Sequence, residues 1–263
     1  MMMSIWDFIV ISLGKFPASW AMPVDTPNVW YAAGTRQTCT MQGFFIQFSL
    51  IVPIYNSMTA LYYLLVVHFG LSNRVIATKV ERWIHICPFV VAFSFAFVGL
   101  VPSMSLYSTS TMWCWMNAEP KGCTQSYQGG ETTCTRGDNA YIYRLAFYYA
   151  PIWCCIIFAT ISMIIIYNAV RKQEANSKRF HANRFNISSV EGRRASKLIK
   201  RRVSKRSQVA TQAYWYVGGF IGVWTVPTIN RVLGFFGIVL YPLTLLHAIF
   251  SPLQGVSSRI CDC

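Results

Sequence analysis

Long apolar stretches without charged residues, separated by shorter polar ones, dominate the chain. Crossing the hydrocarbon core of a bilayer takes about 20 apolar residues in a helix, and a helix satisfies every backbone polar group internally. The pattern therefore predicts an all-α membrane helix bundle, with residues 1–263 as one transmembrane domain. We expect six transmembrane helices, at residues 5–22, 41–69, 83–107, 145–170, 207–230 and 232–258.

The first of these segments, residues 5–22, is the weakest, because Asp7 and Lys15 interrupt it. It could instead be a cleaved signal peptide, since Ser19-Trp20-Ala21 has a small-x-small pattern. A signal peptide begins with a basic region, however, and this chain has Asp7 there. Spanning and cleavage both stay open.

Composition and charge narrow the class of protein further. Hydrophobic residues make up 54% of the chain and charged residues only 12%, whereas soluble domains carry about 25% charged residues. The formal net charge is +14, but 13 Lys/Arg and two acids between Ala169 and Arg206 supply 13 − 2 = +11 of it. Because the charge is confined to one segment, nucleic-acid binding is disfavoured.

The same cations predict the orientation of the bundle, since cytoplasmic loops are enriched in Lys and Arg. Arg74, Lys79 and Arg82 follow the second segment, and residues 171–206 form a long basic loop after the fourth. The alternating loops are poor in cations. We therefore expect a multi-pass protein of the plasma membrane, with residues 171–206 in the cytoplasm and residues 108–140 as an extracellular loop that contains cysteines.

Four of the nine cysteines lie on the side expected to be extracellular, where disulfides persist. They allow three connectivities, and we favour Cys39–Cys114 with Cys123–Cys134; free or alternatively paired thiols remain open. A zinc site at Cys123 and Cys134 is disfavoured, because no histidine is nearby. The other cysteines are expected to be apolar fillers within helices or, near the end of the chain, palmitoylation sites: Cys87, Cys154, Cys155, Cys261 and Cys263.

A polar stripe runs along the second segment, because Gln42, Ser49 and Asn56 recur every seven residues and Tyr63 follows. Such a stripe faces the bundle. It is either a ligand pocket or an internal switch, or else a set of interhelical hydrogen bonds worth about 0.6 kcal/mol each. Prolines within the segments predict kinks: Pro53, Pro88, Pro151, Pro227, Pro242 and Pro252.

Several functional classes lack the residues that they need. The last five segments carry no charge, which disfavours proton-coupled transporters and voltage sensors. The chain has no glycine-rich phosphate loop, zinc-binding histidine pair or serine-nucleophile elbow. We therefore predict no enzyme, no cofactor and no metal.

Three local motifs point to one family. They are Cys39-x-x-Gln42-Gly43-Phe44 at the head of a helix, Trp113-Cys114-Trp115 in the next outer loop, and Ser251-Pro252-Leu253-Gln254-Gly255 in the last segment. With the long basic inner loop, they make the chain resemble seven-helix G-protein-coupled receptors of the slime-mould cyclic-AMP and secretin-like group. The resemblance covers nearly the whole chain if the six segments are helices two to seven, so a first helix is missing from the match.

The chain also departs from receptor patterns. His68-Phe69-Gly70 stands where rhodopsin-like receptors carry an Asp-Arg-Tyr type triplet, and residues 232–258 lack Asn-Pro-x-x-Tyr. No large extracellular domain precedes the helices, unlike in typical secretin-like receptors. A small-solute transporter or channel is the alternative class.

The resemblance implies an unknown extracellular ligand bound in the outer half of the bundle and a heterotrimeric G protein at the inner surface. The expected ligand contacts are Gln42, Phe45, Ser49, Tyr143 and Trp224. Contacts with the G protein, or with anionic inner-leaflet lipids, are expected at Arg74, Lys79, Arg82, Arg171, Lys172, Arg201, Arg202, Lys205 and Arg206. Two arginines precede each of Ser196 and Ser204, which predicts phosphorylation by a basophilic kinase.

Overall fold

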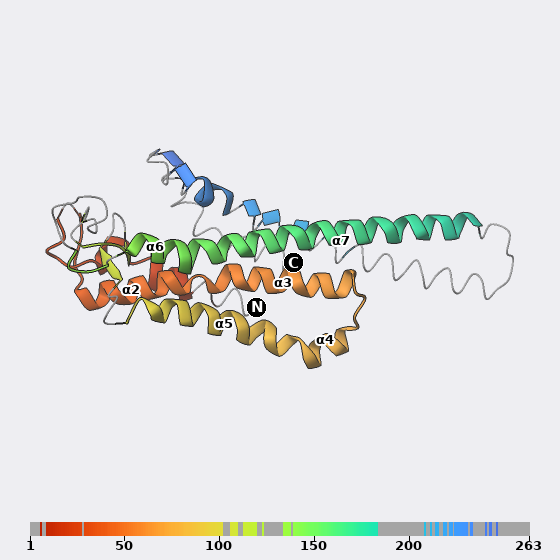
Figure 1. The fold of residues 1–263 in the computed structure, drawn as a ribbon, viewed down its shortest axis with the longest axis horizontal. Coiled ribbons are helices and arrows are strands. Elements are labelled where there is room, and N and C mark those ends of the chain that lie inside the picture. The colour runs from red at the N-terminus through yellow and green to blue at the C-terminus, as the bar shows by residue number, and fades with distance from the viewer. Residues whose placement is uncertain are drawn as a thin grey trace.

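The structure is a computed structural model, and it is mostly helical (Figure 1). It describes residues 6, 9–27, 29–101, 106–109, 113–119, 123, 134–137 and 139–183. It also describes short pieces at 208, 211, 214–215, 218–219, 221–222, 224–230, 232–233, 240, 242–243 and 246.

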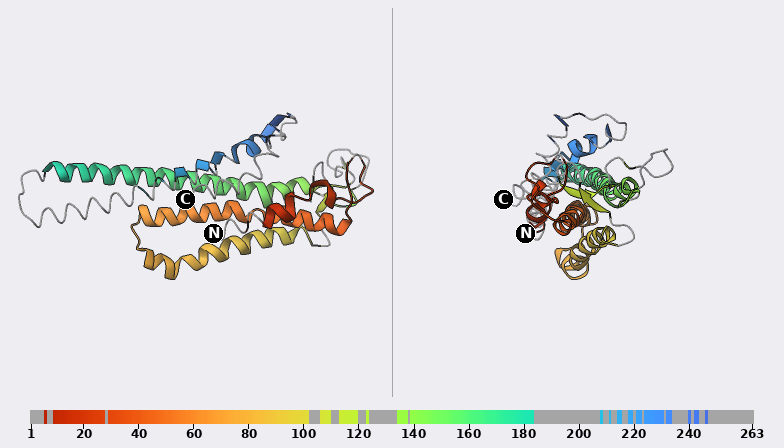
Figure 2. Two further views of the ribbon diagram at one scale, coloured as in Figure 1. Left: turned by 180° about the vertical axis from the view of Figure 1, so that it is seen from behind. Right: turned by 90° about the vertical axis from the view of Figure 1, so that its left-hand side faces the viewer.

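Long helices lie side by side along the molecule. The elements in chain order are η1 (Ile11–Lys15), η2 (Ala18–Ala21), α2 (Arg36–Phe48), α3 (Ile51–Val67), α4 (Asn73–Lys79), α5 (Glu81–Val98), β1 (Tyr107–Thr109), β2 (Cys114–Met116), α6 (Ala140–Arg144), η3 (Leu145–Tyr149) and α7 (Ala150–Asn183). The pair α2–α3 packs against both α5 and α7, and Figure 2 shows the bundle from behind and from one end.

Three helical stretches in the described residues are long and apolar enough to cross a membrane, not the expected six. They are Arg36–Val67, Glu81–Val98 and Ala140–Gln173, in place of the second, third and fourth predicted segments. In the described part of the first predicted segment, residues 6 and 9–10 are α-helical and the five-residue π-helix η1 follows directly. The short 3₁₀-helix η2 comes after Pro17. The fifth segment is described in short pieces, from residue 208 to residues 224–230, and all of these pieces are helical. The sixth falls largely outside the described residues.

The boundaries of the spans also differ from the predicted ones. The second helix begins at Arg36 rather than 41, because Thr35 caps it: its side chain accepts from Thr38 N–H while Thr38 Oγ1 accepts from Thr35 N–H. The third ends at Val98, well before residue 107, and Tyr107 lies in strand β1. The bundle is therefore not purely α-helical, since β1 and β2 form a small antiparallel hairpin.

The expected basic loop 171–206 is helical in its first part, because α7 continues to Asn183. Beyond Val170 the apolar residues give way to charged and polar ones that still favour a helix. In Figure 1 this end of α7 extends past α3 and α4.

The helices pack closely where the residues at their contacts are small. Ala60, Ala92, Ala96 and Ala159 are fully buried, which lets helix backbones approach as they do in membrane bundles. By contrast, α5 exposes a column of stacked rings at Phe89, Phe93 and Phe97. An exposed apolar face of this kind marks a protein or membrane contact.

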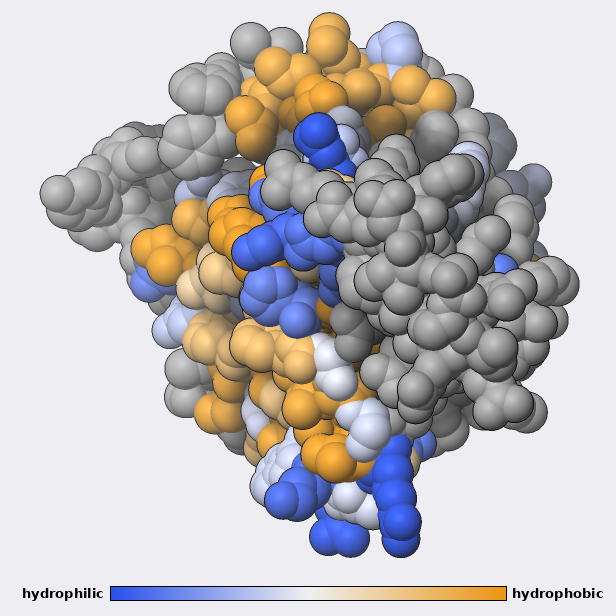
Figure 3. Space-filling view, turned by 90° about the vertical axis from the view of Figure 1, so that its right-hand side faces the viewer, coloured by the Kyte–Doolittle hydropathy of each residue, from blue (hydrophilic) through white to orange (hydrophobic). Residues whose placement is uncertain are grey.

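The two ends of the bundle differ in chemistry. The hairpin, the start of α2 and the start of α6 lie at one end, and α4 with the end of α3 lies at the other (Figure 1). Gln173 Nε2 donates to Val67 O over 3.3 Å, which places the neighbouring Arg171 and Lys172 at the α4 end. Figure 3 views the molecule from that end, where hydrophilic side chains lie beside apolar helix faces.

Candidate functional site at the disulfide-linked end

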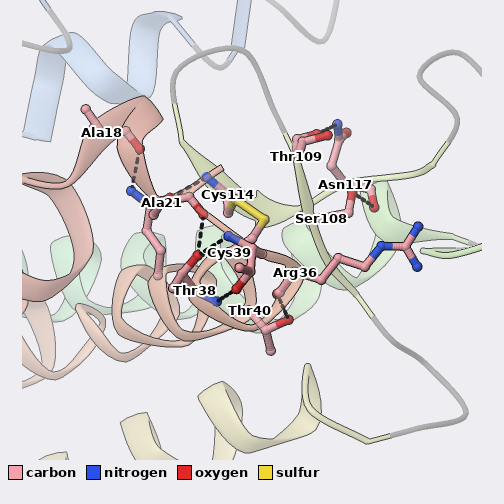
Figure 4. The surroundings of a disulfide bond; sticks show 12 residues. Ala18, Ala21, Arg36, Thr38, Cys39, Thr40, Ser108, Thr109, Cys114 and Asn117 are labelled. Carbon is pink, nitrogen blue, oxygen red and sulfur yellow. Dashed lines mark hydrogen bonds between the residues drawn. A yellow bond between two sulfur atoms is a disulfide. The ribbon is translucent and has the colours of Figure 1, made fainter. Parts of the chain in front are cut away.

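A disulfide joins Cys39 in the first turn of α2 to Cys114 at the start of β2, with 5.2 Å between their Cα atoms (Figure 4). A second disulfide joins Cys123 to Cys134. Both pairs agree with the connectivity favoured from the sequence. Cys39 and Cys114 are buried in one apolar cluster with Met22. The hairpin is therefore held covalently against the head of α2.

Gln42 strengthens this attachment with two hydrogen bonds, one from the nitrogen and one to the oxygen of its side-chain amide. Its Nε2 donates to Ala18 O over 2.9 Å, and its Oε1 accepts from Cys114 N–H over 2.8 Å. Thr38 Oγ1 donates to Ala21 O in the same region (Figure 4). Because Gln42 is 2% exposed, its polar atoms hold η2 and β2 on α2.

Tyr107 of β1 inserts between α2 and α5. Its hydroxyl donates to Ala96 O over 2.6 Å, and its ring lies where side chains on Gly43 and Gly99 would otherwise be. Burial raises the pKa of the Tyr107 hydroxyl, since the phenolate would lose its hydration. The two glycines are required because the ring occupies their Cβ space.

Two prolines interrupt the backbone hydrogen bonds of two neighbouring helices at the same level of the bundle. Proline cannot donate the helical hydrogen bond to the carbonyl four residues earlier. Pro53 therefore interrupts the helix near Ser49, and α2 ends there before α3 begins. Pro151 frees the carbonyl of Phe147, which lies in the π-helix η3. We call these two neighbouring segments, Ser49–Pro53 and Phe147–Pro151, the proline junction.

Polar side chains bridge the proline junction. Gln47 Nε2 donates to the freed Phe147 O over 2.8 Å, and Gln47 Oε1 accepts from Trp115 Nε1 over 3.1 Å. Ser49 Oγ lies 2.6 Å from Ile46 O and 3.1 Å from the Tyr148 hydroxyl. Since Gln47 is fully buried, its amide links α2, the hairpin and η3 in a water-poor setting.

Trp115 is the point where the hairpin meets the proline junction. Its ring centroid lies 4.9 Å from that of Tyr148, in an edge-on arrangement. The Arg144 guanidinium lies 5.1 Å from the Trp115 ring centroid and donates to Met116 O. The hairpin is thus joined to α6 and η3 as well as to α2.

The expected ligand contacts are only partly brought together. Gln42 and Ser49 are buried, and their hydrogen bonds go to the protein itself. Phe45 lies edge-on to Phe44, Tyr143 stacks on Phe147, and Trp224 packs against both main apolar clusters. The polar stripe does face the interior, and hydrogen-bonded support is what the geometry at these two positions favours.

The expected cytoplasmic contacts that the structure describes gather at the α4 end. Arg74, Lys79, Arg82, Arg171 and Lys172 all have exposed side chains there. The remaining predicted positions lie outside the described residues: Arg201, Arg202, Lys205, Arg206, Ser196, Ser204, Cys261 and Cys263.

Sequence reasoning missed Gln47, Tyr148 and Arg144. Gln47 lies off the seven-residue stripe, yet Pro151 marks the carbonyl that needs its amide. Arg144 comes just before an apolar run and was not counted among the loop cations. In the described part of the chain, no three His, Cys, Asp or Glu side chains gather as a metal site.

Comparison with protein families, curated proteins and solved structures finds no significant match. The function therefore has to be argued from the arrangement of this chain's own residues.

Proposed function

We propose that the protein is a membrane receptor of the G-protein-coupled type, which transmits an extracellular stimulus to a cytoplasmic G protein. The observation that carries the proposal is the separation of two different ends by one helix pair. At one end of α2–α3 a disulfide-held hairpin meets the proline junction, and at the other end exposed cations gather on α4 and α7. Sensing and coupling need two such surfaces on one moving element.

The proline junction supplies a route between the ends. Helices bend where a proline removes a backbone hydrogen bond, and at Phe147 O a side chain of the neighbouring helix supplies the bond instead. A ligand that changes the hairpin would act on Trp115, which holds Gln47 and packs on Tyr148. It would shift the helix packing by as much as its affinities for two packings differ.

The exposed cations suit the inner surface in two ways. They orient the bundle by the positive-inside rule, and each adds about 1 kcal/mol of attraction to anionic lipids. The G-protein role is additional to both. In that role, Arg74 and Lys79 of α4 and Arg82 at the start of α5 bind acidic side chains of the G protein.

The first experiment is orientation. A tag inserted near Asn186 should be protected in intact cells and one near Gly129 accessible, and the Asn186-Ile187-Ser188 sequon should stay unglycosylated. The reverse pattern would overturn the receptor proposal, because the disulfides would face the cytoplasm.

The second experiment is nucleotide exchange on co-expressed G proteins in isolated membranes. Arg74→Gln with Arg82→Gln should lower exchange, whereas Gln37→Ala at the disulfide end should leave it unchanged. Solute flux into vesicles, without exchange on any G protein, would favour the transporter class instead.

A further inference from the structure

An open hollow of about 80 Å³ lies at the disulfide-linked end, where three outer segments meet. Its lining includes the buried residues Cys39 and Tyr107 and three residues with hydroxyl groups, Thr26, Ser108 and Thr109. Four formally charged residues also line it: Asp25, Arg36, Glu119 and Arg136. We call this the outer hollow. Among the described residues no ion pair joins these four groups, so their charges are left for water or a ligand.

The walls of the outer hollow are held in place. Glu119 and Arg136 stand opposite each other in an antiparallel bridge, with Glu119 N donating to Arg136 O over 3.0 Å. Residues directly opposite in such a pair project to the same side. Gly137 follows with a positive φ of 70°, and a side chain there would collide with Asn117 O. The Cys123–Cys134 disulfide closes the chain between the two charged residues.

The other wall consists of the turn after Pro23 and the start of α2, and backbone hydrogen bonds hold it in place. Pro23 pairs with Gly34, whose N–H donates to Met22 O over 2.8 Å, and Thr26 N donates to Pro23 O. This turn presents Asp25, while Arg36 begins the capped helix α2. In Figure 4 the Arg36 side chain extends on the side of the disulfide where Ser108 and Thr109 lie.

We propose that the outer hollow binds a small water-soluble zwitterion of amino-acid size, with a carboxylate towards the arginines and an ammonium towards the acids. Two cations and two anions make the lining formally neutral, so a single ion would be attracted by one pair and repelled by the other. A zwitterion uses both. The volume of about 80 Å³ is several times the minimum of about 10–15 Å³ that one water needs, so the open hollow has room for a small ligand.

A divalent cation fits the outer hollow less well. Calcium takes 6–8 oxygen ligands, and the hollow offers only two carboxylates with two arginines beside them. The proposal deepens the proposed function, on which it rests for calling the occupant a signal. Binding itself is measured without a G protein, so the failure of one can be told from the failure of the other.

The test uses the purified full chain in detergent micelles with both disulfides intact. Titration calorimetry is run with glycine and with γ-aminobutyrate, and with acetate and methylammonium as single-charge probes. At least one zwitterion should bind about tenfold more tightly than either single-charge probe. If neither zwitterion binds up to about 10 mM, or if acetate or methylammonium binds equally well, the proposal is wrong.

Variants then locate the binding. Arg36→Gln and Asp25→Asn change exposed side chains, and each should weaken binding about tenfold, since a hydrogen bond to a charged group is lost. Arg36→Lys should retain most of the affinity, and Gln37→Ala should retain all of it. Glu119→Gln and Arg136→Gln should act like the first pair. Unchanged binding in correctly folded Arg36→Gln and Asp25→Asn would place the ligand elsewhere and overturn the proposal.

Discussion

Replacing Gln47 with leucine should destabilise the protein far more than its position on a helix suggests. The side chain is fully buried and makes two hydrogen bonds, one to the carbonyl of Phe147 and one to the indole N–H of Trp115. Leucine keeps most of the volume but can make neither bond. Pro151 cannot donate the α-helical hydrogen bond to this carbonyl, so the carbonyl depends on the amide of Gln47.

Two estimates of the magnitude compete. If the bonds are ordinary interhelical bonds in a membrane bundle, they are worth about 0.6 kcal/mol each, or about 1 kcal/mol together. If the substitution leaves two buried groups unsatisfied, each costs about 1–3 kcal/mol. Two unsatisfied groups would together cost about 2–6 kcal/mol. We expect a loss in the lower part of this range, about 2–4 kcal/mol, because Gln47 bonds a carbonyl that Pro151 has left without its helical donor.

The assay is thermal unfolding in detergent micelles. A loss of this size should lower Tm by about 4–16 °C for a chain of this length. Gln37→Leu is the matched control, since Gln37 lies on the same helix but is exposed, and surface changes stay within about 0.5 kcal/mol.

A double-mutant cycle with Trp115→Phe sharpens the test. Trp115→Phe removes the indole N–H that Gln47 accepts, so the double variant should be less destabilised than the sum of the two by about 1 kcal/mol. Additive losses, or a Gln47→Leu loss below about 1 kcal/mol, would refute the role given to the proline junction.

Three further predictions concern the same end. Cys39→Ala and Cys114→Ala should each lower surface expression, with little further loss in the double variant. Because Cys39 and Cys114 are 75 residues apart in the sequence, losing their disulfide should lower the free energy of unfolding by about 4 kcal/mol, more than losing the Cys123–Cys134 disulfide with its separation of 11 residues. Gly43→Ala should cost about 1–3 kcal/mol in an unfolding assay because its Cβ would lie 2.6 Å from the Tyr107 ring, whereas Gly218→Ala has open space and should not destabilise. The raised pKa of Tyr107 means that the folded state holds this proton more tightly, so stability is full below about pH 10 and falls above it; Tyr107→Phe should flatten that alkaline fall in Tm.

The sequence predicts the strongly patterned parts of this fold. Charge-free runs locate three helices, because spanning a bilayer needs a long apolar stretch, but the ends differ from the predicted ones by two to nine residues. The side of the bundle limits the outer cysteines to three connectivities, and the structure contains the favoured one, which includes Cys39–Cys114. The capping of α2 by Thr35 and the hairpin were missed, because a five-residue shift and a three-residue strand leave little periodicity to detect.

The site is less predictable, because the role of each residue depends on partners that are distant in the sequence and close only in the fold. Gln47 and Gln42 are both glutamines on one helix, yet only the three-dimensional positions of Phe147 O and Ala18 O say what each amide does. The prolines are the exception. A proline leaves the carbonyl four residues before it without its helical donor, so Pro151 points to Phe147 O from sequence alone, and that carbonyl accepts from Gln47. Pro53 points in the same way to Ser49 O, but there the backbone N–H of Val52 takes over the bond.

The hairpin register brings the proposed ligand and the proline junction into one mechanical unit. Ser108 and Thr109, which line the outer hollow, stand opposite Trp115 and Cys114 in the antiparallel pair. A ligand that draws β1 towards Arg36 would therefore move Trp115, and with it the amide of Gln47. Coupling of this kind is reciprocal. If the path operates, loosening the junction with Gln47→Leu must also change the affinity of the outer hollow, although Gln47 touches none of its walls.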